Sequence, residues 1–136
     1  MTEHDTGITA DLIAGLLRDQ HPDLAGLPIR EVEGGWGNQI WRLGDDLAVR
    51  IQRMATDPGR LLKEERWLPL LAPSLPLPVP VPIRYGRPSA RSSKSWSVVT
   101  WVPGVPLDHG SITRGEHAAH TLATFLRALH VVAPPD

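Results

Sequence analysis

Arg50 is the one charged side chain in the segment Leu47–Ile51, which is otherwise apolar. Because side chains alternate between the two faces of a β-strand, Ala48 and Arg50 share one face and the three larger apolar residues share the other. A small residue beside a guanidinium lets a flat ring lie against Ala48 while Arg50 reaches a phosphate. The alternative interpretation is an ordinary half-exposed strand with a solvated arginine.

Glu64 is an acidic residue at a position that a helix would turn inward. In the helix predicted around it, Glu64 shares a stripe with Leu61 and Leu68. A buried carboxylate without a partner is costly, and Arg50 on the adjacent strand is the cation available to pair with it. Glu65 is the rival candidate for that pairing, and the alternative is that both acids lie on the surface of a charged helix.

A cluster of glycines, GGWGN at residues 34–38, precedes a predicted hairpin. Glycine lets a backbone bend sharply or approach a ligand closely, and the N–H groups of such a turn can bind phosphate oxygens. A plain β-turn explains many such clusters, so the glycines alone are weak evidence for a phosphate site. The evidence is the order of elements along the chain: a glycine turn, a hairpin, a strand with the pattern A-x-R, and a helix with an inward acid. The candidate phosphate-binding residues of this turn are Gly35, Trp36, Gly37 and Asn38.

The elements that must position these residues follow from hydrophobic periodicity and turn residues, which predict an α+β chain. Thr9 and Asp11 are candidate caps of a first helix, Gly44–Asp46 is a tight turn between strands, and Pro58 begins a middle helix. The predicted helices end near His21, Leu71 and His130, and the predicted strands are Ile29–Glu33, Gln39–Leu43, Leu47–Ile51, Ile83–Gly86 and Ser97–Val102.

Size and charge limit the partners of the chain. Its 136 residues correspond to about one domain, and its formal net charge is -1, so nothing electrostatic favours nucleic acid or an anionic membrane. It has no cysteine, which excludes disulfides and thiolate chemistry. Residues 1–7 lack an apolar leader, and the long uncharged run at 67–83 is broken by prolines. We therefore expect a cytoplasmic protein that binds neither nucleic acid nor membrane.

Four segments together resemble the N-terminal part of the aminoglycoside phosphotransferase family, namely GGWGNQIWRLGDDLAVRI, LLKEERWLPLLAPSLPLPVPVP, WSVVTWVPGVPLD and TLATFLRALH. The resemblance extends from about Ile29 to Pro135. It implies a protein-kinase-like N-terminal lobe, in which a five-stranded antiparallel sheet with a packed helix is followed by a hinge and one helix of the C-terminal lobe. It also implies ATP or GTP with Mg²⁺ as cofactor and a small molecule with a hydroxyl group as substrate.

The resemblance assigns roles to the residues already singled out. It places Arg50 where the family more often has lysine, and Glu64 as the helix partner of that cation. It also places residues 35–38 over the nucleotide phosphates, and Ala48 is then the small residue against which the ring of the nucleotide lies. The hinge whose backbone would meet adenine consists of Thr100, Trp101 and Val102.

Two parts of the family pattern have no match up to Asp136, the catalytic H-G-D-x-x-x-x-N segment and a later metal-binding Asp. We therefore predict no catalytic and no metal-binding residue in this chain, and no phosphoryl transfer by it alone. The predicted domains are residues 1–102, the lobe with its N-terminal helix, and residues 103–136, the hinge and first helix of a truncated C-terminal lobe.

Other hypotheses stay open. A non-catalytic kinase-like module can self-associate as a homodimer through an apolar stripe on the last helix. Pro73–Pro76 fits the P-x-x-P motif of proline-recognising domains, although the run also suits a connector packed on the sheet. The Asp108–Ser111 turn and the pair of His117 and His120 lack the partners that a catalytic or zinc site needs. The stripe consists of Ala118, Leu122, Phe125, Leu126 and Leu129.

Overall fold

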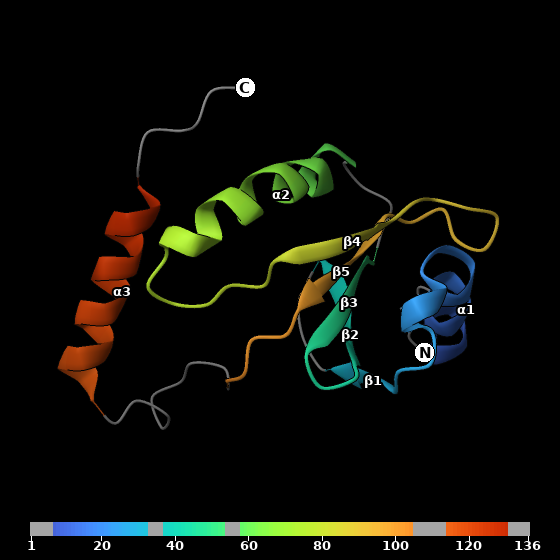
Figure 1. Ribbon diagram of the computed structural model, residues 1–136, viewed down its shortest axis with the longest axis horizontal. Coiled ribbons are helices and arrows are strands. Elements are labelled where there is room, and N and C mark those ends of the chain that lie inside the picture. Colours follow the sequence, from blue (N-terminus) through green and yellow to red (C-terminus); the bar gives the residue numbers. More distant parts are fainter. Residues whose placement is uncertain (1–6, 33–36, 54–57, 105–113, 131–136) are drawn as a thin grey trace.

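A computed structural model describes residues 7–32, 37–53, 58–104 and 114–130. Figure 1 shows a sheet with α1 packed on one side of it, α2 running alongside β4, and α3 at the opposite end of the molecule from α1. The helices are α1 (Ala10–Gln20), α2 (Pro58–Leu71) and α3 (Gly115–Leu129), with 3-10 turns η1 (Pro22–Leu24) and η2 (Ala72–Ser74). The strands are β1 (Ile29–Val32), β2 (Asn38–Leu43), β3 (Leu47–Gln52), β4 (Pro82–Gly86) and β5 (Trp96–Thr100).

The five strands form one antiparallel sheet in the order β1-β2-β3-β5-β4, which confirms the predicted fold class. Gly44 has a φ of 63° in the turn between β2 and β3, a conformation that glycine adopts without strain. β5 ends at Thr100, two residues earlier than predicted, although the Trp101 N–H still donates to the carbonyl of Asp46, the next residue in the β3–β5 register, at 2.8 Å. No helix in the described part of the chain is long and apolar enough to span a membrane.

One face of the sheet is buried against α1. Thr9 caps this helix as predicted, since its Oγ1 accepts a hydrogen bond from the Leu12 N–H at 3.2 Å. Helical spacing turns three apolar residues of α1 toward the sheet, and each is at most 1% exposed. These residues, Ile13, Leu16 and Leu17, form a core with Trp41, Leu43, Val49, Ile51, Trp96 and Val98.

The C-terminal end of α1 covers the outer edge of β4. The Gln20 side chain donates to the Arg87 carbonyl at 3.0 Å and accepts from the Arg87 N–H at 2.9 Å. The His21 ring bonds to the Tyr85 carbonyl at 2.8 Å. These backbone groups belong to an edge strand and its extension, where no neighbouring strand satisfies them, so the side chains of α1 complete their hydrogen bonding.

The opposite face of the sheet, toward α2, is more open than predicted. The expected inward stripe around Glu64 is wrong in part, because no side chain of residues 62–71 is fully buried. Leu62 and Leu70 are 62% and 58% exposed, while Leu68 is half-buried. The physical reason is position: α2 lies along the edge strand β4, whereas the main hydrophobic core forms between α1 and the sheet.

Candidate functional site

Arg50 and Glu64 form the ion pair that the sequence predicted. The Arg50 Nη1 donates to the Glu64 Oε2 at 2.8 Å, and the Nη2 lies 3.5 Å from the Oε1, so both carboxylate oxygens face the guanidinium. The two side chains are 23% and 27% exposed. The rival pairing with Glu65 is not formed, and the site therefore joins β3 to α2 through Glu64.

The sheet register places Ala48 beside this pair. Arg50 lies between Ile40 of β2 and Ser97 of β5, and Ala48 lies two residues away on the same strand face. Ala48 is 1% exposed, so the face opposite the α1 core is also closely covered at this point. A ring could therefore contact Ala48 only after the groups that cover it move aside, and it would then lie next to the Arg50 guanidinium.

The Arg50–Glu64 pair contributes little to folding. Ion pairs between partly solvated side chains contribute about 0–1 kcal/mol, because water screens the charges and ordering two long side chains costs entropy. A bidentate arginine–carboxylate arrangement nevertheless fixes the direction in which the guanidinium points. The pair is therefore better suited to positioning a cation than to holding α2 on the sheet.

The glycine turn lies only partly within the described residues. Gly35 and Trp36 are outside them, and the predicted role of these two residues stays a prediction. Gly37 is exposed, and its carbonyl accepts a hydrogen bond from the Arg53 N–H at 3.0 Å. Asn38 begins β2 opposite Gln52, so the C-terminal part of the turn lies at the end of β3 that follows Arg50.

Several backbone groups of the predicted hinge already form hydrogen bonds within the protein. The Thr100 N–H donates to the Val81 carbonyl at 3.0 Å, and its Oγ1 accepts from the Val81 N–H at 2.9 Å. The N–H of Trp101 is also engaged, by the Asp46 carbonyl. Within the described part of the chain, the Val102 N–H forms no such backbone hydrogen bond and is the donor of these three that could contact a ligand.

Arg42 is a residue of this region that sequence reasoning missed. It lies opposite Ala48 in the register of β2 and β3, and its guanidinium stacks 4.6 Å from the centre of the Trp101 ring. Its Nη2 donates to the Asp45 carbonyl at 2.8 Å. Alternation along β2 places Arg42 on the Ala48 face, but the stacking depends on where the chain turns after β5.

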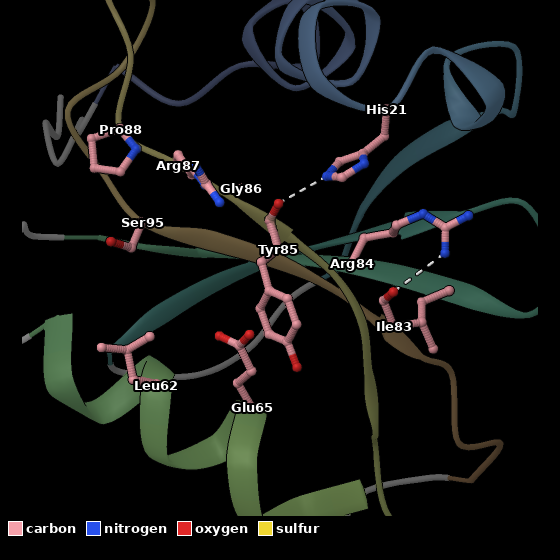
Figure 2. A pocket seen from close by; sticks show the side chains of 10 residues that line it. All are labelled: His21, Leu62, Glu65, Ile83, Arg84, Tyr85, Gly86, Arg87, Pro88 and Ser95. Carbon is pink, nitrogen blue, oxygen red and sulfur yellow. Dashed lines mark hydrogen bonds between the residues drawn. The ribbon is translucent and has the colours of Figure 1, made fainter.

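A cavity of about 530 Å³ lies elsewhere, between β4 and α2 (Figure 2). Residues of β4 and its extension form one wall, and Leu62 and Glu65 of α2 form the other. None of the residues predicted to bind a nucleotide lines it. The cavity and the Arg50–Glu64 pair are thus two separate features on the α2 side of the sheet.

Comparison with protein families finds a match over most of the chain. The model of the phosphotransferase enzyme family matches residues 28–136. A comparison with curated proteins finds no match. The family match confirms the predicted resemblance and covers β1 through α3.

Solved structures share the fold at low sequence identity. The GDP complex of aminoglycoside 2'-phosphotransferase-IIIa has a TM-score of 0.76 and 21% identity over 89% of this chain. The GDP and kanamycin complex of APH(2")-IIIa has a TM-score of 0.75 and 20% sequence identity over 89% of this chain. The streptomycin–ATP complex of APH(2")-IIa has a TM-score of 0.56 and 16% sequence identity over 99% of this chain. In each case the chain spans 42% of the length of the neighbour.

Proposed function

Because the chain belongs to the phosphotransferase enzyme family, we propose that it is the nucleotide-binding lobe of a small-molecule kinase. The complete enzyme transfers the γ-phosphate of ATP or GTP to a hydroxyl group of its substrate. Structural neighbours solved with GDP and with ATP support a nucleotide as the ligand. The observation that carries the proposal is the Arg50–Glu64 pair at 2.8 Å beside Ala48.

In this proposal each part of the site has a distinct role. Arg50 binds nucleotide phosphate oxygens while Glu64 holds its guanidinium in place, since the five N–H donors of a guanidinium can bond a carboxylate and a phosphate at the same time. The purine lies against Ala48, and the hinge contacts it through the Val102 N–H or the carbonyls. Gly37 and Asn38, with the preceding glycines, lie over the phosphates.

Mg²⁺ accompanies the nucleotide in such a transfer and neutralises the phosphate charge. The described residues contain no group of three His, Cys, Asp or Glu side chains arranged to hold a metal ion. Since the chain also spans 42% of its neighbours, we propose that it binds nucleotide and that transfer requires further residues.

Titration of the 136-residue chain with ATP, with and without Mg²⁺, tests this proposal. We expect weak binding by the wild type, and an affinity lower by about tenfold in Arg50→Ala, because a charge-assisted hydrogen bond to phosphate is lost. Glu64→Gln should cause a smaller loss, since the cation remains but is less well oriented. Arg18→Ala, an exposed arginine on α1, is the matched control and should bind like wild type.

Two results would contradict the proposal. Equal ATP affinity for the wild type and Arg50→Ala would remove the role of the ion pair. Measurable transfer of phosphate to an acceptor by this chain alone would show that the catalytic groups are already present within it.

A second candidate function is a non-catalytic module that forms a homodimer through α3. The observation in its favour is the exposure of Leu122 (53%) and Leu126 (41%) one helical turn apart. Light scattering during size-exclusion chromatography should then give twice the monomer mass for the wild type and the monomer mass for Leu122→Glu. A monomer at every concentration of the wild type would exclude this function.

A further inference from the structure

The cavity between β4 and α2 has a size and a lining typical of small-molecule sites. Its volume of about 530 Å³ lies within the usual range for ligand pockets, about 300–1,000 Å³. Apolar side chains of α2 and β4, Leu62 and Ile83, are 62% and 38% exposed. Figure 2 shows that the Tyr85 ring stands between these two walls. The cavity therefore offers an apolar surface that water now covers.

Glu65 brings a negative charge into this cavity. Its side chain is half-buried and points from α2 toward β4, beside the Tyr85 ring (Figure 2). Within the described ranges, no hydrogen bond or ion pair engages its carboxylate, whereas the preceding Glu64 is bound to Arg50. The carboxylate is therefore available to form a charge-assisted hydrogen bond with a cation that enters the cavity.

The Tyr85 phenol lies in the negative field of the nearby carboxylates. Burial, together with the carboxylates of Glu65 and Glu64, raises the pKa of the Tyr85 phenol above its ordinary value. The phenol thus stays neutral, and the face of its ring attracts cations through its quadrupole. The α2 end of the cavity accordingly combines a carboxylate with an aromatic ring, which is the chemistry that binds an ammonium group.

The basic groups at the other end of the cavity are mostly engaged within the protein. Arg84 is paired with Asp23 at 3.1 Å and also donates to the Ile83 carbonyl. The His21 ring is bonded to the Tyr85 carbonyl. Arg87 is exposed at the rim, where water screens its charge. The half-buried Glu65 is therefore the stronger determinant of what the cavity binds.

We propose that this cavity binds a small organic amine, whose ammonium group contacts the Glu65 carboxylate and the Tyr85 ring while its apolar body packs against Leu62. This inference goes beyond the proposed nucleotide site and does not depend on it. No residue of the Arg50 site is needed for the contact, so the two sites can be tested separately.

Phenethylamine, which is protonated at neutral pH, is a suitable probe because it joins one ammonium group to one aromatic ring. The experiment titrates it into the uniformly ¹⁵N-labelled 136-residue chain and follows amide chemical shifts by NMR. 2-Phenylethanol and 3-phenylpropionate, of similar size but neutral and anionic, are titrated in parallel. We expect saturable shifts at residues 83–87 and 62–65, with the amine binding about tenfold more tightly than the alcohol.

Variants assign the contact to its residues. Glu65→Gln should remove the advantage of the amine over the alcohol, and Tyr85→Phe, which keeps the ring, should retain it. Glu116→Gln, which removes an exposed acid from the first turn of α3, is the matched control and should behave like wild type.

Three outcomes would overturn the proposal. The first is equal affinity of the wild type for amine and alcohol, which requires no variant to fold. The second is tighter binding of 3-phenylpropionate, which would assign the site to the Arg87 end. The third is shifts confined to residues outside the cavity.

Discussion

The two faces of the same sheet are built for different purposes. On the α1 face, Leu16 and Trp96 are each 1% exposed and belong to one continuous core. On the α2 face, Arg50 and Glu64 keep about a quarter of their surface in water, and Leu62 is 62% exposed. One face excludes water from apolar side chains, while the other presents charged groups beside open space.

The energies of the two kinds of interaction explain how one face can supply stability while the other binds a ligand. Burying one large aliphatic side chain contributes about 1.5–3 kcal/mol, whereas a partly exposed ion pair contributes about 0–1 kcal/mol. Stability therefore resides in the α1 face, and the charged groups of the α2 face can be arranged for binding at little cost to the fold. Variants on the two faces should separate stability from ligand affinity.

The largest expected effect comes from comparing the same substitution on two helices. Leu16→Ala should lower the free energy of unfolding by about 2–5 kcal/mol, because it leaves a cavity in the α1 core. Leu62→Ala on α2 removes an exposed side chain and should change it by less than about 0.5 kcal/mol. Urea unfolding followed by circular dichroism measures both. Similar losses would contradict the assignment of stability to the α1 face.

Local sequence signals were sufficient for the elements and for one contact. The Thr9 cap and the glycine turn at Gly44 are local signals, so they predict α1 and the β2–β3 hairpin closely. The pairing of Arg50 with Glu64 was predicted for a reason that is only partly right. Burial was expected to force the pairing, yet both side chains remain partly in water.

Long-range contacts account for what the sequence did not predict. The cavity depends on how β4 pairs with β5, and that pairing contains an irregularity between Pro82 and Arg84 that no local pattern indicates. The position of Glu65 beside β4 and the stacking of Arg42 on Trp101 likewise depend on tertiary placement. Sequence periodicity gives the face of a strand, but not the element that covers that face.

An intermediate effect is expected where the α1 face meets β4. A Cβ at Gly86 would collide with the ring of the fully buried Trp96, and that ring cannot move freely within the core. Gly86→Ala should therefore lower the free energy of unfolding by about 1–3 kcal/mol through overpacking. Gly26→Ala, where nothing lies within 4 Å of the added carbon, is the matched control. A stable Gly86→Ala protein would mean that the core near β4 is loosely packed.

The smallest effect is expected for an ion pair on the surface of the α1 region itself. The Arg91 Nε donates to the Asp19 Oδ2 at 2.8 Å, and this hydrogen bond is the main reason that the pKa of Asp19 lies below its ordinary value. The contribution of the pair to stability is therefore present above the unfolded pKa of aspartate, about 3.9, and is lost as the pH falls through the lower folded value. The Asp19–Arg91 pair lies near the core, but because it is exposed to water its contribution to stability remains small.

Asp19→Asn should accordingly cause a small loss of stability at pH 7 that disappears in acid, below the folded pKa of Asp19. Urea unfolding of the wild type and the variant between pH 7 and pH 2 measures this convergence. Asp45→Asn, in the exposed turn between β2 and β3, controls for removing an acid outside the Arg91 contact. A loss of stability that stays constant down to the lowest pH would show that Asp19 acts through packing, and the α1 face would then depend on its rim as well as on its core.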